Sequence, residues 1–151
     1  AYMTPQVAHL QTIGLETLSL RYNRAAETCL NLALELEKLN EIESVNYTGL
    51  KSNRFYNISK QQFGKYAGAM LTFNLKSRSA CFIFMNKLKL IKRATNLFDN
   101  KSLAIHPEST IYGSFPKEEK EKMDINPNTI RLSVGLEDIE DLLVDIKDSL
   151  K

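Results

Sequence analysis

The fold is decided by Asn128-Thr129-Ile130-Arg131-Leu132-Ser133-Val134-Gly135-Leu136-Glu137-Asp138. Apolar residues alternate with polar ones from position 129 to position 134, which predicts a strand with one buried face. Gly135 ends this strand. Acidic residues then begin at Glu137, where they predict the first turn of a helix, because the helix dipole favours negative charge there.

Arg131 lies on the polar face of this predicted strand. A strand holds a guanidinium more rigidly than a loop does, and the planar fork of arginine suits a carboxylate or a phosphate. The alternative is a structural arginine that pairs with a nearby Asp or Glu. Composition alone favours that alternative.

Length, composition and net charge are those of an ordinary globular protein. Its 151 residues suit one domain, and 43% are apolar and 25% charged. A net charge of +2 gives no indication of nucleic acid or an acidic membrane as a partner. No apolar run is long enough for a bilayer, and no signal peptide is evident. Cys29 and Cys81 fall in amphipathic stretches, so we expect reduced thiols and a cytoplasmic location.

The periodicities predict helices and strands in alternation. Expected helices cover 4–20, with Thr4 as N-cap, then 25–39 after a break at 21–24, 53–62, 79–86 with Ser77 as cap, 117–122, and the C-terminal stretch from 136. Expected strands cover 44–47, 69–75, 87–93, 102–107 and 128–134. Two helices followed by strands and helices with short connections predict an α+β fold, an open sheet with helices on one face.

Motifs for a self-contained active site are missing from the sequence. It has no Gly-rich phosphate loop, no His/Cys cluster with metal-ligand spacing, no nucleophile elbow and no paired carboxylates in a supporting motif. The basic cluster at 87–93 has no interleaved aromatic residues, so we interpret it as a solvated strand. The residues alone therefore predict one wall of a binding site, without a metal.

Several motifs together carry a family resemblance. They are Ser102-Leu103-Ala104-Ile105-His106-Pro107, Ser109-Thr110, Ile130 to Asp138 with Ile139-Glu140-Asp141-Leu142, and upstream Gly14 to Leu18, Val45-Asn46-Tyr47 and Asn86-Lys87-Leu88. In this order they resemble the C-terminal part of the Cys/Met-metabolism family of pyridoxal-phosphate enzymes. The resemblance implies the small C-terminal domain of a fold-type I transferase, with a mostly antiparallel sheet.

The resemblance also implies roles for single residues. Arg131 would bind the α-carboxylate of an amino-acid substrate, and Ser102 with the backbone at Leu103 would border the same pocket. Thr110 is a further wall residue in this interpretation, whereas His106 before proline has a structural role. Family chemistry needs a lysine that binds pyridoxal phosphate covalently, and no lysine here stands in such a motif. We therefore expect that lysine in a preceding large domain, and no activity from this chain alone.

Lys101 before the serine, and Ile105-His106-Pro107 after it, are most similar to O-acetylhomoserine sulfhydrylases. Methionine γ-lyase and the cystathionine γ-synthases and γ-lyases are the alternatives. Expected partners are O-acetylhomoserine and sulfide, with no nucleic acid and no membrane, in a dimer or tetramer. Residues 1–40 would connect to the large domain and 41–151 would form the C-terminal domain. The start at Ala1 suggests a piece of a longer protein; a stand-alone, non-catalytic binding module with this fold is the remaining hypothesis.

Four departures from the family pattern lie near the expected pocket. Phe98 replaces a usual glycine, Glu108 a usual alanine, Ile111-Tyr112 a common Thr-His, and Ser77-Arg78 a frequent Gly-Gly. We expect them to change the mouth of the pocket and leave the carboxylate site intact.

Overall fold

A central sheet organises the protein, which we describe from a computed structural model covering residues 2–151. Within these residues the sheet has five strands in the order β1-β2-β5-β4-β3. The strands are β1 (Ile42–Asn46), β2 (Met70–Leu75), β3 (Lys92–Arg93), β4 (Leu103–Ile105) and β5 (Thr129–Ser133). Only the β3–β4 pair is parallel among the described strands, so the predicted mostly antiparallel sheet is confirmed.

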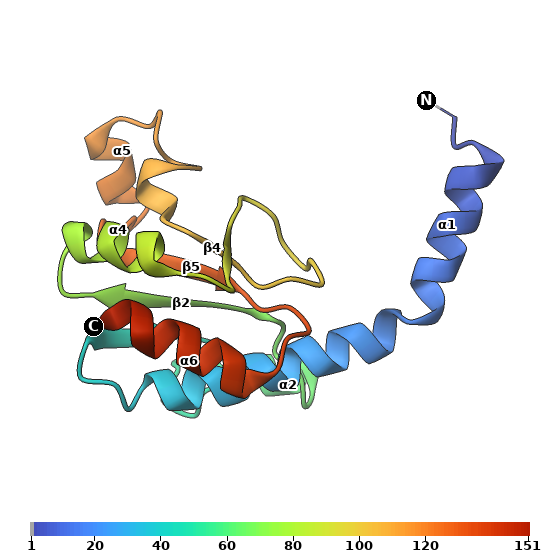
Figure 1. The fold of residues 1–151 in the computed structure, drawn as a ribbon, viewed down its shortest axis with the longest axis horizontal. Coiled ribbons are helices and arrows are strands. Elements are labelled where there is room, and N and C mark those ends of the chain that lie inside the picture. Colours follow the sequence, from blue (N-terminus) through green and yellow to red (C-terminus); the bar gives the residue numbers. More distant parts are fainter. Residues whose placement is uncertain (1) are drawn as a thin grey trace.

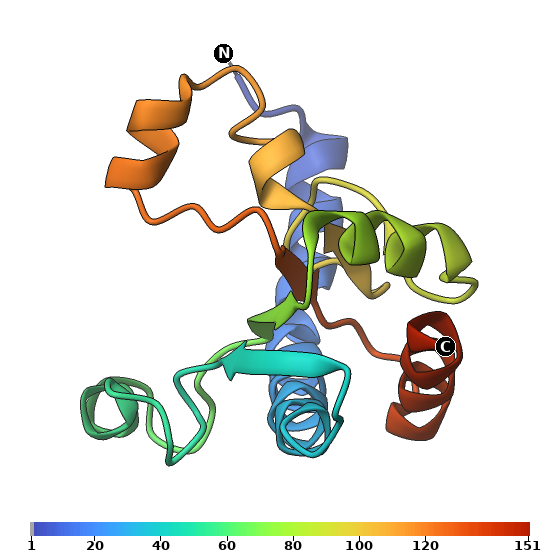
Figure 2. The same ribbon diagram turned by 90° about the vertical axis from the view of Figure 1, so that its left-hand side faces the viewer.

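Three helices cover one face of the sheet (Figure 1). The helices of the described chain are α1 (Pro5–Glu16), α2 (Leu18–Leu36), α3 (Tyr56–Phe63), α4 (Arg78–Lys87), α5 (Lys117–Lys122) and α6 (Ile139–Leu150), with a 3-10 turn η1 (Pro107–Ser109). Helices α2, α4 and α6 share one apolar core with β2, β4 and β5. Figure 2 shows α5 on the side of the sheet opposite α4 and α6. The α+β prediction is confirmed, although α5 departs from the expected placement of all helices on one face.

Alternation along β5 produces the two faces. Ile130 and Leu132 are fully buried in the core, as are Leu71 and Phe73 on the neighbouring β2. Arg131 points to the other face and is only partly buried. Because β5 is hydrogen-bonded to β2 on one side and β4 on the other, the backbone that carries Arg131 is held from both sides.

The predicted break at 21–24 is wrong, because the first helix ends earlier, at Glu16, and α2 runs through this region. The kink lies at Thr17, and Arg21 bridges it: its Nη2 donates to the Gly14 carbonyl at 2.6 Å and its Nε donates to Thr17 Oγ1 at 3.3 Å. The Thr4 cap is confirmed, since its side chain accepts from the Val7 amide.

The predicted strand at 87–93 is also wrong, apart from its last two residues. Helix α4 extends to Lys87, and the backbone N–H groups of Lys89, Leu90 and Ile91 donate to the carboxylate of Asp145 on α6, at 2.8 to 3.1 Å. Donors that a strand would offer to a neighbouring strand are satisfied here by one buried side chain. The short β3 begins only after them.

The C-terminal helix begins at Ile139, later than predicted. Asp138 is its N-cap and accepts from the Glu140 amide at 3.0 Å, so Leu136 and Glu137 precede the helix. Helix α3 likewise begins at Tyr56 instead of position 53, whereas Ser77 caps α4 as predicted.

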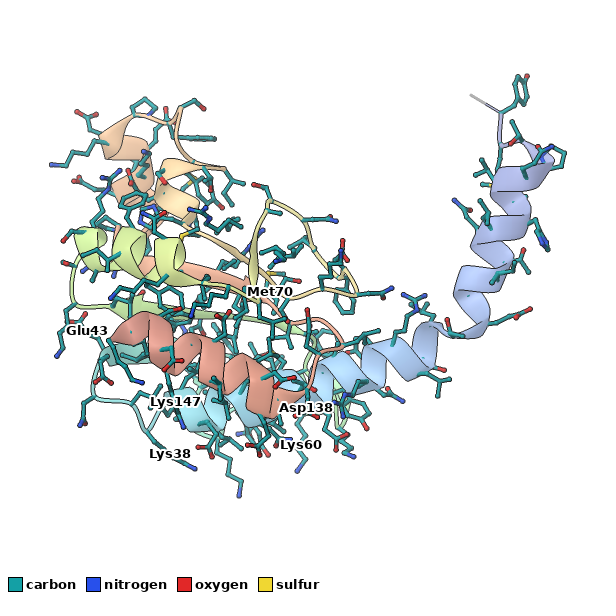
Figure 3. The ribbon with its side chains drawn as sticks, in the orientation of Figure 1. Lys38, Glu43, Lys60, Met70, Asp138 and Lys147 are labelled. Atoms are coloured by element: carbon teal, nitrogen blue, oxygen red, sulfur yellow. The ribbon has the colours of Figure 1, made fainter. Side chains whose placement is uncertain are left out.

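Helix α1 projects away from the rest of the molecule (Figure 1). None of its residues is buried, and Figure 3 shows its side chains extending into open surroundings. Val7, Leu10 and Ile13 are between 44% and 67% exposed. No helix among the described residues is both long and apolar enough to cross a membrane.

Candidate functional site

Arg131 lines a cavity of about 400 Å³ on the face of the sheet opposite the core helices. Strands β1, β2 and β5 form its floor with Asn46, Thr72, Asn74, Thr129 and Arg131. The other wall is formed by Pro107, Ile111, Tyr112 and residues 124–126. The floor side chains are polar, because they occupy the outward positions of strands whose alternate residues fill the core.

The Arg131 guanidinium has no hydrogen-bond or ion-pair partner among the described residues. Its directly paired strand neighbours, Thr72 and Ile105, carry no charge. Partial burial lowers the pKa of Arg131, and the nearby Tyr112 opposes this shift; the side chain stays charged at neutral pH because arginine deprotonates only far above it. Within residues 2–151 Arg131 therefore does not form the ion pair with Asp or Glu that the structural alternative requires.

Leu103 pairs with Ser133 on β5, two residues beyond Arg131, and neither Ser102 nor Leu103 lines the Arg131 cavity. The fully buried Ser102 hydroxyl donates to Glu137 Oε2 at 2.8 Å and accepts from the Gly135 amide at 2.9 Å. Its own amide donates to Glu137 Oε1 at 2.7 Å. These bonds join the start of β4 to the turn after β5. Their role in substrate binding stays a prediction.

Gly135 is required at this junction by close approach. A Cβ atom there would lie 2.5 Å from the Asn100 carbonyl oxygen and 2.5 Å from Glu137 Oε2. Glu137, which the sequence pattern placed in a helix, instead holds the strand ends together. Nothing local in the sequence indicates this contact, since Ser102 and Glu137 are 35 residues apart.

His106 is buried and fully hydrogen-bonded within the protein. Its Nε2 lies 2.7 Å from the Pro127 carbonyl, which can only accept, so this nitrogen carries the proton and Nδ1 accepts from Ser109. Thr110 donates its hydroxyl to the His106 carbonyl at 2.8 Å and does not line the cavity. Both residues shape the segment after β4.

Two of the sequence departures meet in space. Arg78 Nε donates to Glu108 Oε2 at 3.0 Å, and Lys120 Nζ donates to Glu108 Oε1 at 2.9 Å. The two cations hold the pKa of Glu108 below its usual range, with the Lys120 hydrogen bond the larger cause. A third departure, Phe98, has a positive φ of 55°, the conformation that favours glycine, and stacks on Tyr22 with ring centroids 5.7 Å apart.

The cavity suits a carboxylate better than a cofactor. Its lining contains no lysine, and no group of three or more His, Cys, Asp or Glu in residues 2–151 is arranged to hold a metal ion. Pyridoxal phosphate needs a covalent lysine partner, which this lining does not offer. We therefore derive no cofactor chemistry from these residues.

The chain is similar to known enzymes that are considerably longer. The chain is 40% identical over 97% of its length to O-acetyl-L-homoserine sulfhydrylase 1 of Thermus thermophilus, and covers 35% of that protein. It is also 40% identical over its full length to L-methionine gamma-lyase of Pseudomonas putida, and covers 38% of it. The chain thus spans little more than a third of these relatives.

A solved structure of O-acetylhomoserine sulfhydrylase from Wolinella succinogenes matches 99% of this chain with a TM-score of 0.86 and 43% identity, over 39% of its own length. A structure from Campylobacter jejuni, assigned by its description to O-acetylhomoserine (thiol)-lyase and carrying a pyridoxyl-lysine phosphate, matches with a TM-score of 0.93 and 38% identity, over 36% of its length. The model of the Cys/Met metabolism PLP-dependent enzymes matches residues 1–151. The chain belongs to this family of pyridoxal-phosphate-dependent enzymes.

Proposed function

We propose that this chain provides the substrate-carboxylate site of a pyridoxal-phosphate-dependent O-acetylhomoserine sulfhydrylase. In that reaction acetate leaves the γ-carbon of O-acetylhomoserine and the sulfur of sulfide takes its place. The observation that supports the proposal is the partly buried Arg131 guanidinium, which has no partner within the described residues and lies among polar side chains of the cavity floor. A carboxylate there accepts two parallel hydrogen bonds, which fix the orientation of the substrate as well as its charge.

The lysine that binds the cofactor belongs, in this proposal, to a large domain beyond the residues of this chain. Helix α1 supports the division, because its exposed apolar residues offer a surface that the C-terminal domain leaves uncovered. Residues 1–40 would then connect the two domains of a cytoplasmic dimer or tetramer, and this chain alone would be inactive.

The experiment uses the protein made from its complete coding region, with R131A and R131K variants. Losing a buried charge partner typically costs about 2–5 kcal/mol, so kcat/KM for O-acetylhomoserine should fall by roughly 100-fold, and R131K should recover only part of it because lysine lacks the fork. R24A is the control, since Arg24 is half-exposed on α2 and does not line the cavity. Unchanged substrate affinity in R131A would refute the assignment.

Absorbance with added pyridoxal phosphate tests whether cofactor binding requires the proposed large domain. The band of bound cofactor should appear with the product of the complete coding region and be absent with residues 1–151. A band in the short chain that disappears when one of its own lysines is replaced would contradict the proposal and indicate a complete site of another design.

Methionine γ-lyase is the second candidate, because the Pseudomonas relative matches this chain as closely as the Thermus one does. Parallel assays distinguish the two: homocysteine formed from O-acetylhomoserine and sulfide indicates a sulfhydrylase, whereas consumption of methionine without a sulfur donor indicates a lyase.

A further inference from the structure

Residues 107–126, which we name the roof segment, cross over the Arg131 cavity from η1 through α5. Glu108 anchors the start of this segment to α4 by accepting from Arg78, and joins it to α5 by accepting from Lys120. Lys120 also donates to the Glu108 carbonyl at 3.2 Å. The side chains of Glu108 and Lys120 are only 18% and 14% exposed, so water weakens this pair little.

Tyr112 is the residue of the roof segment that carries a hydroxyl and lines the cavity. Its backbone is held by its N–H bond to the Pro107 carbonyl at 3.0 Å and by the bond from the Phe115 N–H to its own carbonyl at 3.1 Å. The ring packs edge-on against Phe115, with centroids 5.7 Å apart. Within residues 2–151 the Tyr112 hydroxyl has no hydrogen-bond partner, so it is available to a ligand.

A carboxylate bound to Arg131 needs donors beyond the guanidinium. Its two oxygens offer about four lone-pair sites, and a bidentate fork occupies two of them. One floor hydroxyl is already used, because Thr129 Oγ1 donates to Asn74 Oδ1 at 2.6 Å. Thr72 and Tyr112 carry the remaining lining hydroxyls, and Tyr112 is close enough to Arg131 to affect its pKa.

We propose that the Tyr112 hydroxyl is a second donor to the substrate carboxylate held by Arg131, and that Glu108 is the positioning residue that keeps it there. This inference rests on the proposed function. Three departures from the family pattern then act together, because the Arg78–Glu108 pair holds the roof segment and the segment presents the phenol of Tyr112 where the family commonly has histidine.

Y112F tests the donor in the protein from the complete coding region. A hydrogen bond to a charged group contributes about 1.5 kcal/mol or more, so KM for O-acetylhomoserine should rise about tenfold while kcat stays within twofold. Y56F is the matched control, because Tyr56 lies on α3 and does not line the cavity. E108A should raise KM in the same direction, and E108Q, which keeps an acceptor oxygen, should recover part of the loss.

The outcomes separate this inference from the proposed function. If R131A leaves KM unchanged, the carboxylate site itself is wrongly assigned. If R131A raises KM while Y112F stays within twofold of the unaltered protein, only the role of Tyr112 is overturned. A rise in KM with T72V and none with Y112F would also overturn it, because the donor would then be on the floor of the cavity.

Discussion

Replacing Asp145 by asparagine tests how residues 88–91 are held. Asp145 lies on α6 and is 7% exposed. Its Oδ1 accepts from the Lys89 amide at 2.8 Å, and its Oδ2 accepts from the amides of Leu90 at 3.1 Å and Ile91 at 2.9 Å. Asparagine keeps one acceptor oxygen and places an NH₂ donor where the second oxygen was. One or two of the three backbone amides therefore lose their acceptor.

The magnitude follows from the number of amides left without a partner. Each buried, unsatisfied donor costs about 1–3 kcal/mol, and the remaining bond loses its charge assistance. We expect D145N to lower the free energy of unfolding by about 2–5 kcal/mol. This is a large share of the roughly 5–15 kcal/mol typical of a folded protein.

Urea unfolding at pH 7, followed by circular dichroism, measures the loss. D141N is the matched control, since Asp141 is exposed in the first turn of the same helix and its replacement should change stability by at most about 1 kcal/mol. Amide hydrogen exchange should also accelerate at Lys89–Ile91 in D145N alone. A change below about 1 kcal/mol with unaltered exchange at these amides would refute the reasoning.

Single side chains carry three further predictions. The pKa of Glu108 is lowered in the folded protein, so its charged form should stabilise the fold at pH values above the ordinary carboxyl pKa. This contribution should disappear as the pH falls through the lowered pKa. The unfolding free energy of E108Q, measured against pH, should therefore vary less in the acid range than that of the unaltered protein. F98G and F98A both remove the stacking on Tyr22, but only glycine relieves the positive φ, so F98G should be more stable than F98A by about 1 kcal/mol in thermal unfolding, and equal stability would contradict this. Burial raises the pKa of the Cys29 thiol, and raises that of Cys81 to about 11, so neither should react with a thiol reagent at pH 8 until denaturant is added; fast labelling of folded protein would contradict their burial.

Local sequence patterns predict the helices and strands that depend on neighbouring residues, or on burial against any apolar core. The alternation around Arg131 was sufficient, because any sheet buries one face of such a strand. The loop at 88–91 was not predictable, since its acceptor, Asp145, is 54–56 residues away. The kink at Thr17 was also not predicted. The polar residues from Arg21 suggested a break, but Arg21 lies within a helix and bonds back to the Gly14 carbonyl.

The sequence indicates Arg131 as a candidate binding residue, but it does not show which side chains surround it. Arg131 was identified by its place on a strand and by the family motif around it. That its guanidinium is unpaired within residues 2–151 depends on which acidic side chains fold near it, which a sequence does not display. The bonds of Ser102 to Glu137 are not evident from the sequence, and the place of Ser102 at the substrate pocket stays a prediction. Tyr112 was noticed only as a departure, because its availability depends on the fold of the roof segment.

The central position of β5 has a consequence for how such an enzyme diversifies. A residue on a strand bonded on both sides cannot shift without disturbing the whole sheet, so the sheet itself fixes the position of Arg131. The roof segment is outside the sheet and is held mainly by side chains, so insertions and substitutions there leave the strand pairings untouched. Under the proposed function, residues 107–126 are therefore the part of the site that can change without disturbing the sheet that holds Arg131.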